Sequence, residues 1–247
     1  MNPRALLARS LVLSCVLAFA GCIEASQTSV AYEAVAVERN GGKGESNGWV
    51  IALSRADVAL GPFYFCAAAS GSSTLCASSI AEIASVSVVN ALAPAPSPLG
   101  RVHGFSGSIQ SVSYDFGISS FDTQTAATPA PSLPGRHSMR LEGEARKGTV
   151  VIPFTADVDV VPQYQGQNAL STAEAIANVE SSATRLEIVL DPAGWMKQLD
   201  FDAIAAKVGA TGDAVFAIEP GMVEHSAILV GIKNLTPLQF RWTAAAP

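Results

Sequence analysis

The chain contains three histidines, and each stands directly before a glycine or a serine at the expected edge of a structural element. These are His103, His137 and His225. Because loops at the ends of a β-sandwich can converge, three imidazoles could together bind Cu²⁺ or Zn²⁺. The spacing contains no H-x-H or H-x3-H pair, however. Three independent surface or capping histidines are the alternative, and the spacing favours them.

A second group of polar residues lies in one alternating segment. Asp157 and Asp159 are two residues apart, as are Glu142 and Glu144, so each pair points to one face of its strand. Four carboxylates on one sheet face could bind Ca²⁺ or act as an acid/base pair. Arg140 shares that face, so an ordinary solvated surface is the simpler interpretation.

Trp195 is the one aromatic candidate for ligand contact, because it lies between Asp191 and Asp200. Carbohydrate sites use an exposed tryptophan beside carboxylates, since the ring stacks on the face of a sugar. Met196 and Leu199 follow closely, and they favour the alternative that Trp195 anchors a helix to the core.

Signals for catalysis are weak. Residues 104–108 read Gly-Phe-Ser-Gly-Ser, which differs from the nucleophile motif G-x-S-x-G at its last position. P-loop, G-x-G-x-x-G, H-E-x-x-H and EF-hand patterns do not occur. We therefore predict no catalytic residues and no cofactor, with Cu or Zn at the histidines as the alternative.

Composition excludes two classes of protein. Apolar residues make up 49% of the chain and charged residues 15%, which is too apolar for a disordered chain. The net charge of −6 lacks the basic surface that nucleic-acid binding requires. The sequence therefore predicts a folded domain that does not bind nucleic acid.

The first 22 residues have the anatomy of a signal peptide. Arg4 and Arg9 precede the apolar residues 11–20, a stretch too short to span a bilayer, which needs about 20 residues. Small residues then lead to Cys22. This ending resembles the lipobox of bacterial lipoprotein signal peptides, and the resemblance covers residues 1–22 only.

The resemblance implies that the chain is cleaved before Cys22 and that a diacylglycerol is attached to its sulfur. The protein is then exported and held at a membrane by its acyl chains, facing the periplasm or the cell surface. Ile23, rather than aspartate, follows the cysteine, which favours the outer membrane. No later segment is long and apolar enough to span a bilayer.

Two of the four cysteines remain available for a disulfide, because Cys15 would be removed with the signal peptide and Cys22 would carry the lipid. Cys66 and Cys76 are expected to form a disulfide in an oxidising compartment. Closing residues 67–75 into a loop would stabilise the domain by about 2–3 kcal/mol. Metal ligation by the two thiols is the alternative.

Alternating apolar residues predict strands, most clearly an antiparallel hairpin over residues 139–160 that turns near Gly148. Further strands are expected over residues 49–53, 58–65, 86–89, 111–118, 185–190 and 240–242. Capping residues predict helices over 201–208 and 227–233, with a third candidate over 172–179. Two long Pro-rich loops are expected over 93–100 and 119–136.

We therefore predict a mainly β protein, an antiparallel β-sandwich with two or three short helices. Its expected parts are a signal peptide over 1–21, a lipid-anchored flexible lead-in over 22–48 and a single sandwich domain over 49–247. The predicted function is that of a non-catalytic cell-envelope lipoprotein that binds an unidentified ligand or protein partner, or serves a structural role. A periplasmic copper or zinc protein and, less favoured, an envelope hydrolase are the alternatives.

Overall fold

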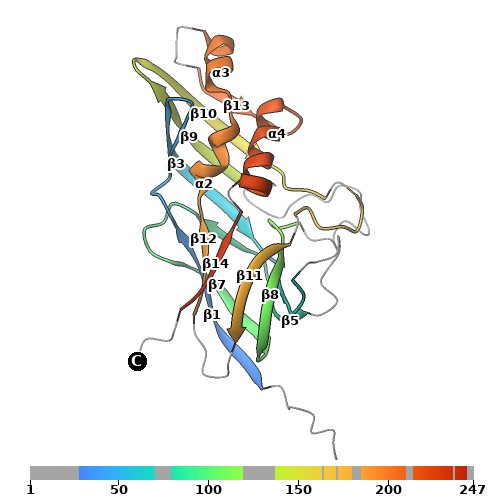
Figure 1. Ribbon diagram of the computed structural model, residues 1–247. Helices are drawn as coiled ribbons and strands as arrows, with labels where there is room; N and C mark the ends of the chain where they lie inside the picture. Colours follow the sequence, from blue (N-terminus) through green and yellow to red (C-terminus); the bar gives the residue numbers. More distant parts are fainter. Residues whose placement is uncertain are drawn as a thin grey trace, which may run out of the picture.

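Fourteen strands form two sheets in the part of the chain that the computed structural model describes. The described residues are 28–69, 79–118, 137–162, 164–170, 172–179, 185–209, 214–235 and 237–243. Three short α-helices lie at one end of the molecule (Figure 1). The mainly β sandwich-like fold predicted from the strand pattern is confirmed.

The larger sheet has eight strands, all antiparallel to their neighbours except for the parallel pair β1–β12. Its two edge strands, β11 and β14, lie side by side without pairing, so the sheet is strongly curved (Figure 1). In order across the sheet, the strands are β11 (Ala173–Val179), β8 (Gly107–Tyr114), β4 (Phe63–Cys66), β5 (Ser79–Ile83), β7 (Ser97–Phe105), β1 (Ser29–Glu38), β12 (Arg185–Leu190) and β14 (Gln239–Thr243).

The smaller sheet has six strands and lies next to the helices. Its main path is β13 (Phe216–Ile218), β10 (Val150–Val158), β9 (Met139–Lys147), β3 (Trp49–Leu60) and β2 (Lys43–Ser46), and β6 (Ser87–Asn90) also pairs with β3. The helices are α2 (Pro192–Trp195), α3 (Phe201–Val208) and α4 (Val223–Val230), with single turns at Met196–Gln198 and Gly231–Leu235.

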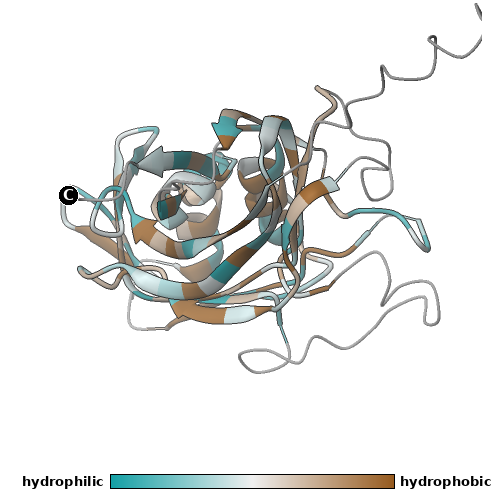
Figure 2. Cartoon of the chain, turned by 90° about the horizontal axis from the view of Figure 1, so that it is seen from below, coloured by the Kyte–Doolittle hydropathy of each residue, from teal (hydrophilic) through white to brown (hydrophobic). Residues whose placement is uncertain are grey.

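The hairpin predicted over residues 139–160 is confirmed as β9 and β10. Its alternation places side chains such as Leu141 and Phe154 in the core, each at most 1% exposed, while Glu142 and Asp157 lie on the outer face. Strands predicted at 185–190 and 240–242 are also confirmed, as β12 and β14. A view along the molecule shows hydrophobic and hydrophilic residues alternating along the strands (Figure 2).

Two aromatic clusters fill the interior. Phe65 and Phe240 belong to the cluster inside the curved sheet, and Phe65 also packs edge-on against Trp242, with ring centroids 5.7 Å apart. Phe201 joins the other cluster beneath the helices, where it lies 5.9 Å from Phe154. The two clusters form one continuous core with the buried aliphatic residues of both sheets.

The N-terminal boundary of the domain differs from the prediction. Residues 22–48 were expected to form a flexible lead-in, but β1 lies between β7 and β12 inside the larger sheet, and β2 pairs with β3. The prediction is therefore wrong for residues 29–46. Two alanines, Ala34 and Ala36, occupy buried positions of β1 and weaken the alternation that marks a strand. The signal-peptide segment and Cys22 lie outside the described residues.

The observed helices match the predicted ones only in part. α3 begins after Asp200, whose carboxylate accepts a hydrogen bond from the Ala203 backbone N–H at 3.0 Å, and it ends before Gly209, as predicted. α4 begins at Val223 rather than Ala227, with Met222 as its N-cap.

The helix expected over 172–179 is wrong, because these residues form strand β11. Pairing with β8 satisfies their backbone groups in place of helical hydrogen bonds. Of the two expected Pro-rich loops, 93–100 ends early, because β7 begins at Ser97, and 119–136 lies outside the described residues. None of the described helices is both long enough and apolar enough to cross a bilayer.

Candidate functional site

A pocket opens where the edges of the curved sheet meet. Its volume is about 370 Å³, and it is lined by residues of β8, β11, β14 and the turn after α4. We call it the seam pocket, and its residues are Tyr114, Leu170, Thr172, Ala173, Glu174, Lys233, Pro237, Leu238, Gln239 and Phe240. Its volume falls in the lower part of the range typical of small-molecule sites, about 300–1,000 Å³.

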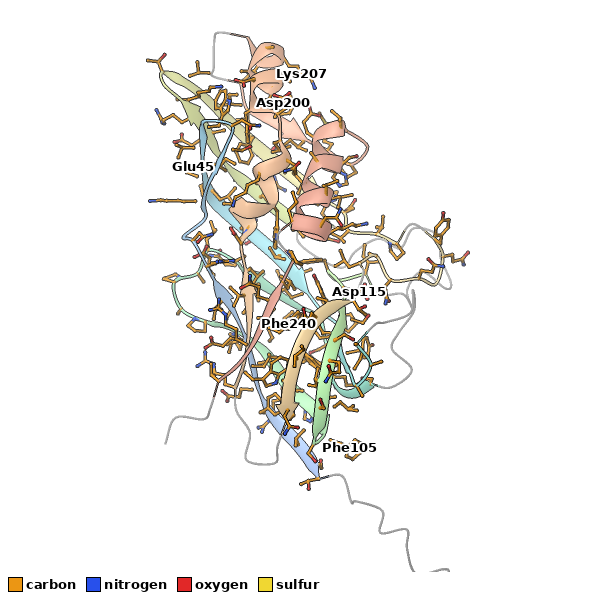
Figure 3. The ribbon with its side chains drawn as sticks, viewed as in Figure 1. Glu45, Phe105, Asp115, Asp200, Lys207 and Phe240 are labelled. Atoms are coloured by element: carbon orange, nitrogen blue, oxygen red, sulfur yellow. The ribbon has the colours of Figure 1, made fainter. Side chains whose placement is uncertain are left out.

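The walls of the seam pocket are mostly apolar and held in place by the core. Phe240 projects from β14 beside β11 (Figure 3), and its ring lies 5.8 Å from that of Tyr114. Leu170 and Leu238 are buried, so their side chains have little freedom to fill the opening. Burial raises the pKa of Tyr114 to about 12, and its hydroxyl is hydrogen-bonded to the backbone of Leu238. Tyr114 therefore provides a neutral, fixed wall.

Lys233 supplies a positive charge in this apolar setting. It lies in the turn Gly231–Leu235, between the buried Ile232 and the exposed Asn234. Burial lowers the pKa of the Lys233 ammonium, and it is the sole cause of that shift. No ion pair joins Lys233 to a carboxylate in the described part of the chain, so its ammonium loses water without a direct charged contact.

Glu174 also lines the seam pocket, but it is exposed. Its neighbour Ala175 is 4% exposed and faces the core, so alternation along β11 directs Glu174 to the outer side of the sheet. The pocket thus combines an apolar wall, one partly desolvated cation and a carboxylate that is open to solvent.

The three histidines do not form the candidate metal site, which their spacing had already disfavoured. His137 and His225 come together around Asp159, but His103 lies in the other sheet, opposite Ala31 of β1 and Glu82 of β5. No group of three or more potential metal ligands forms among the described residues. His103 instead lines a separate pocket with neighbours such as Phe105. Phe105 lies at the end of the molecule opposite the helices (Figure 3).

The contact between His137, Asp159 and His225 ties α4 to the smaller sheet. Asp159 accepts from His137 Nδ1 at 3.0 Å, and its backbone N–H donates to His225 Nε2 at 3.2 Å. Burial lowers the pKa of His225, with a further small contribution from His137, while the charge of Asp159 acts in the opposite direction. His225 is therefore a neutral acceptor in this arrangement, which is a structural role.

The carboxylates on the outer face of the smaller sheet are paired with arginines. Arg55 contacts Asp57 at 2.6 Å and Glu142 at 2.9 Å, and Arg140 lies 3.3 Å from Glu142 and 3.9 Å from Asp157. These residues come from β3, β9 and β10, and the sheet register brings them together. The face is a network of ion pairs rather than an open calcium or acid/base site.

Trp195 and Ser106 do not occupy ligand sites either. Trp195 is 1% exposed and packs edge-on against Phe116 at 5.9 Å, so the candidate stacking role for it is wrong. It is a core anchor, as the neighbouring Met196 and Leu199 favoured. Ser106 lies in the turn between β7 and β8 and accepts a hydrogen bond from the Thr28 backbone N–H at 3.1 Å. A strand–turn–strand does not provide the strand–turn–helix of a nucleophile motif.

Cys66 ends β4 and is fully buried. Cys76 lies outside the described residues, so its pairing with Cys66 stays a prediction. Sequence reasoning missed the seam pocket because its residues come from four separated segments, around residues 114, 170–174, 233 and 237–240. The one local signal was Lys233, a lysine that directly follows the apolar stretch 227–232.

Comparison with known proteins identifies no relative: no family model, no curated protein and no solved structure matches this chain.

Proposed function

We propose that this chain is an exported bacterial lipoprotein, anchored to the outer membrane through Cys22, whose β domain binds a small ligand without catalysing a reaction. The seam pocket carries the binding part of this proposal, because it joins a largely apolar cavity to the partly buried Lys233, which forms no ion pair with any described carboxylate. The lipobox-like segment before Cys22 supports the anchor.

The chemistry of the seam pocket favours binding over catalysis. Tyr114 holds its proton far above neutral pH, and its hydroxyl already bonds to a backbone group. The pocket offers shape and one cation rather than a nucleophile aligned with a general base. The charged groups of the smaller sheet neutralise one another on a solvated face instead of converging on a cavity.

A disulfide between Cys66 and Cys76 belongs to the same proposal. Export places the domain in an oxidising compartment, and Cys66 ends a core strand close in sequence to Cys76. Peptide mass analysis of the exported protein, with and without reduction, tests this pairing. Alkylation of both thiols without prior reduction would contradict it.

Membrane attachment is tested with the full precursor expressed in a bacterium that has an outer membrane. The mature protein should begin at Cys22, carry the mass of the attached lipid and fractionate with the outer membrane. The Cys22→Ser variant should lose both the lipid and normal processing. Wild-type protein released without lipid into the soluble periplasmic fraction would contradict the anchor.

Ligand binding is tested with octanamide, a neutral amphiphile of suitable size, titrated onto the lipidated protein in phosphatidylcholine vesicles. Trp242 reports occupancy, because it contacts Phe65 of the cluster that also holds Phe240. Ala173→Leu should narrow the seam pocket and abolish the signal. A wild-type signal that is absent, or that survives in this variant, would contradict the seam pocket as the binding site.

A further inference from the structure

The ammonium of Lys233 determines which ligands the seam pocket favours. A partly desolvated cation gains most from a ligand group of opposite charge that replaces the water it has lost. The apolar walls around it, formed by residues such as Leu170, Leu238 and Phe240, favour a hydrocarbon or aromatic body. The ligand thus needs an anionic head and an apolar body.

Glu174 limits the charge of that head. Glu174 belongs to the exposed rim of the same pocket, and like charges repel. A dianionic phosphate would interact unfavourably with Glu174 and would exceed the single charge of Lys233. A carboxylate carries one negative charge, and an ammonium can donate to both of its oxygens.

The other groups around the pocket are compatible with a carboxylate bound at Lys233. The Tyr114 hydroxyl is neutral and hydrogen-bonded to the Leu238 backbone, so the positive charge on the pocket wall comes from Lys233. The unpaired edges of β11 and β14 bound the opening, so a ligand can enter without breaking a β-ladder.

We infer that the seam pocket binds a small amphiphile with a single carboxylate head, which pairs with the Lys233 ammonium while the apolar body lies against Leu238 and Phe240. This inference rests on the proposed binding function and deepens it by assigning the class of ligand. We expect the pocket to bind monocarboxylates more tightly than neutral, cationic or phosphorylated amphiphiles of the same length.

The experiment compares octanoate, octanamide, octylammonium and octyl phosphate on the lipidated protein in phosphatidylcholine vesicles, with Trp242 fluorescence as the readout. Octanoate should bind at least about tenfold more tightly than octanamide, which corresponds to one charge-assisted hydrogen bond. Lys233→Met should bring octanoate down to the affinity of octanamide. Lys233→Arg, which keeps the charge, should retain the preference.

Lys197→Met is the matched control, because Lys197 is exposed and lies outside the seam pocket. It should leave all four affinities unchanged. Equal binding of octanoate and octanamide to the wild type, a preference for octylammonium or octyl phosphate, or a preference for octanoate that survives in Lys233→Met would each overturn the carboxylate assignment. In those cases octanamide binding that Ala173→Leu abolishes still supports the pocket, whereas its absence overturns the proposed function itself.

Discussion

The outer face of the smaller sheet and the seam of the larger sheet differ in whether their charged side chains form ion pairs. Arg55, Glu142, Arg140 and Asp157 form a continuous series of ion pairs across three strands, and each side chain keeps access to water. At the seam, Lys233 is half-buried and forms no such ion pair with the residues that the structure describes. Many charges therefore cancel on one surface, whereas a single charge is left to act in the other.

The difference has a simple physical origin. Exposed ion pairs are screened by water and contribute little free energy, so a sheet face can carry many of them without any function. A cation that has lost water is unfavourable unless something compensates it. In this protein, the burial of a charged group without an ion pair therefore marks a functional group better than a high density of charged residues does.

The largest contrast between the regions should appear in core substitutions. Phe154→Ala, beneath the helices and 1% exposed, should reduce the free energy of unfolding by about 3–5 kcal/mol. Phe240→Ala should cost less, because Phe240 is only partly buried at the seam. Urea unfolding with an unchanged m-value measures both losses. Equal losses would mean that the seam wall is packed as tightly as the core beneath the helices.

A smaller effect is expected where α3 begins. Asp200→Ala removes the acceptor of the Ala203 N–H and should destabilise the protein by about 1 kcal/mol. Asp200→Asn keeps a side-chain acceptor and should retain most of the stability, so it is the matched control. If both variants unfold at the same urea concentration, the hydrogen bond at the N-cap does not stabilise the helix.

The ion pairs on the outer face of the smaller sheet should contribute still less to the stability of the protein. In a double-mutant cycle of Arg140→Met and Glu142→Gln, the coupling energy should stay below about 1 kcal/mol, because both side chains are about one-third exposed. High salt should reduce it further. A coupling of several kcal/mol would show that the face is not a screened surface, and the comparison with the seam would fail.

Protonation of His225 should change the free energy of unfolding least, because the charge of Asp159 opposes the effect of burial on its pKa. The folded state holds this proton less tightly than the unfolded state, whose pKa is near 6.5. Stability should therefore be constant above about pH 6.5 and fall as the pH drops below it. Protonation would also remove the acceptor of the Asp159 N–H.

Urea midpoints between pH 5 and pH 8 measure this dependence. His225→Gln should reduce it, whereas His103→Gln should leave it unchanged, since His103 lies in the other sheet. If the midpoint of the wild type rises on acidification through this range, the predicted sign is wrong.

Local pattern predicted those elements whose partners lie close in sequence. The hairpin β9–β10 could be recognised because strict alternation and a glycine turn specify both its pairing and its inner face. The strand over 29–38 is only weakly marked in the sequence, because alanines at its buried positions give little contrast. Residues 172–179 resemble a capped helix locally, but the edge of β8 requires a partner and makes them a strand.

By itself, the sequence determined the β class, the main hairpin, the helix that follows Asp200 and the lipobox-like start of the chain. Each depends on residues a few positions apart, where backbone geometry and side-chain alternation act directly. Only the tertiary structure decided that His103 stands apart from His137 and His225, that Trp195 is buried and that Lys233 faces a pocket. These outcomes depend on the curvature of the larger sheet, which brings β11 next to β14, and no local pattern encodes that contact.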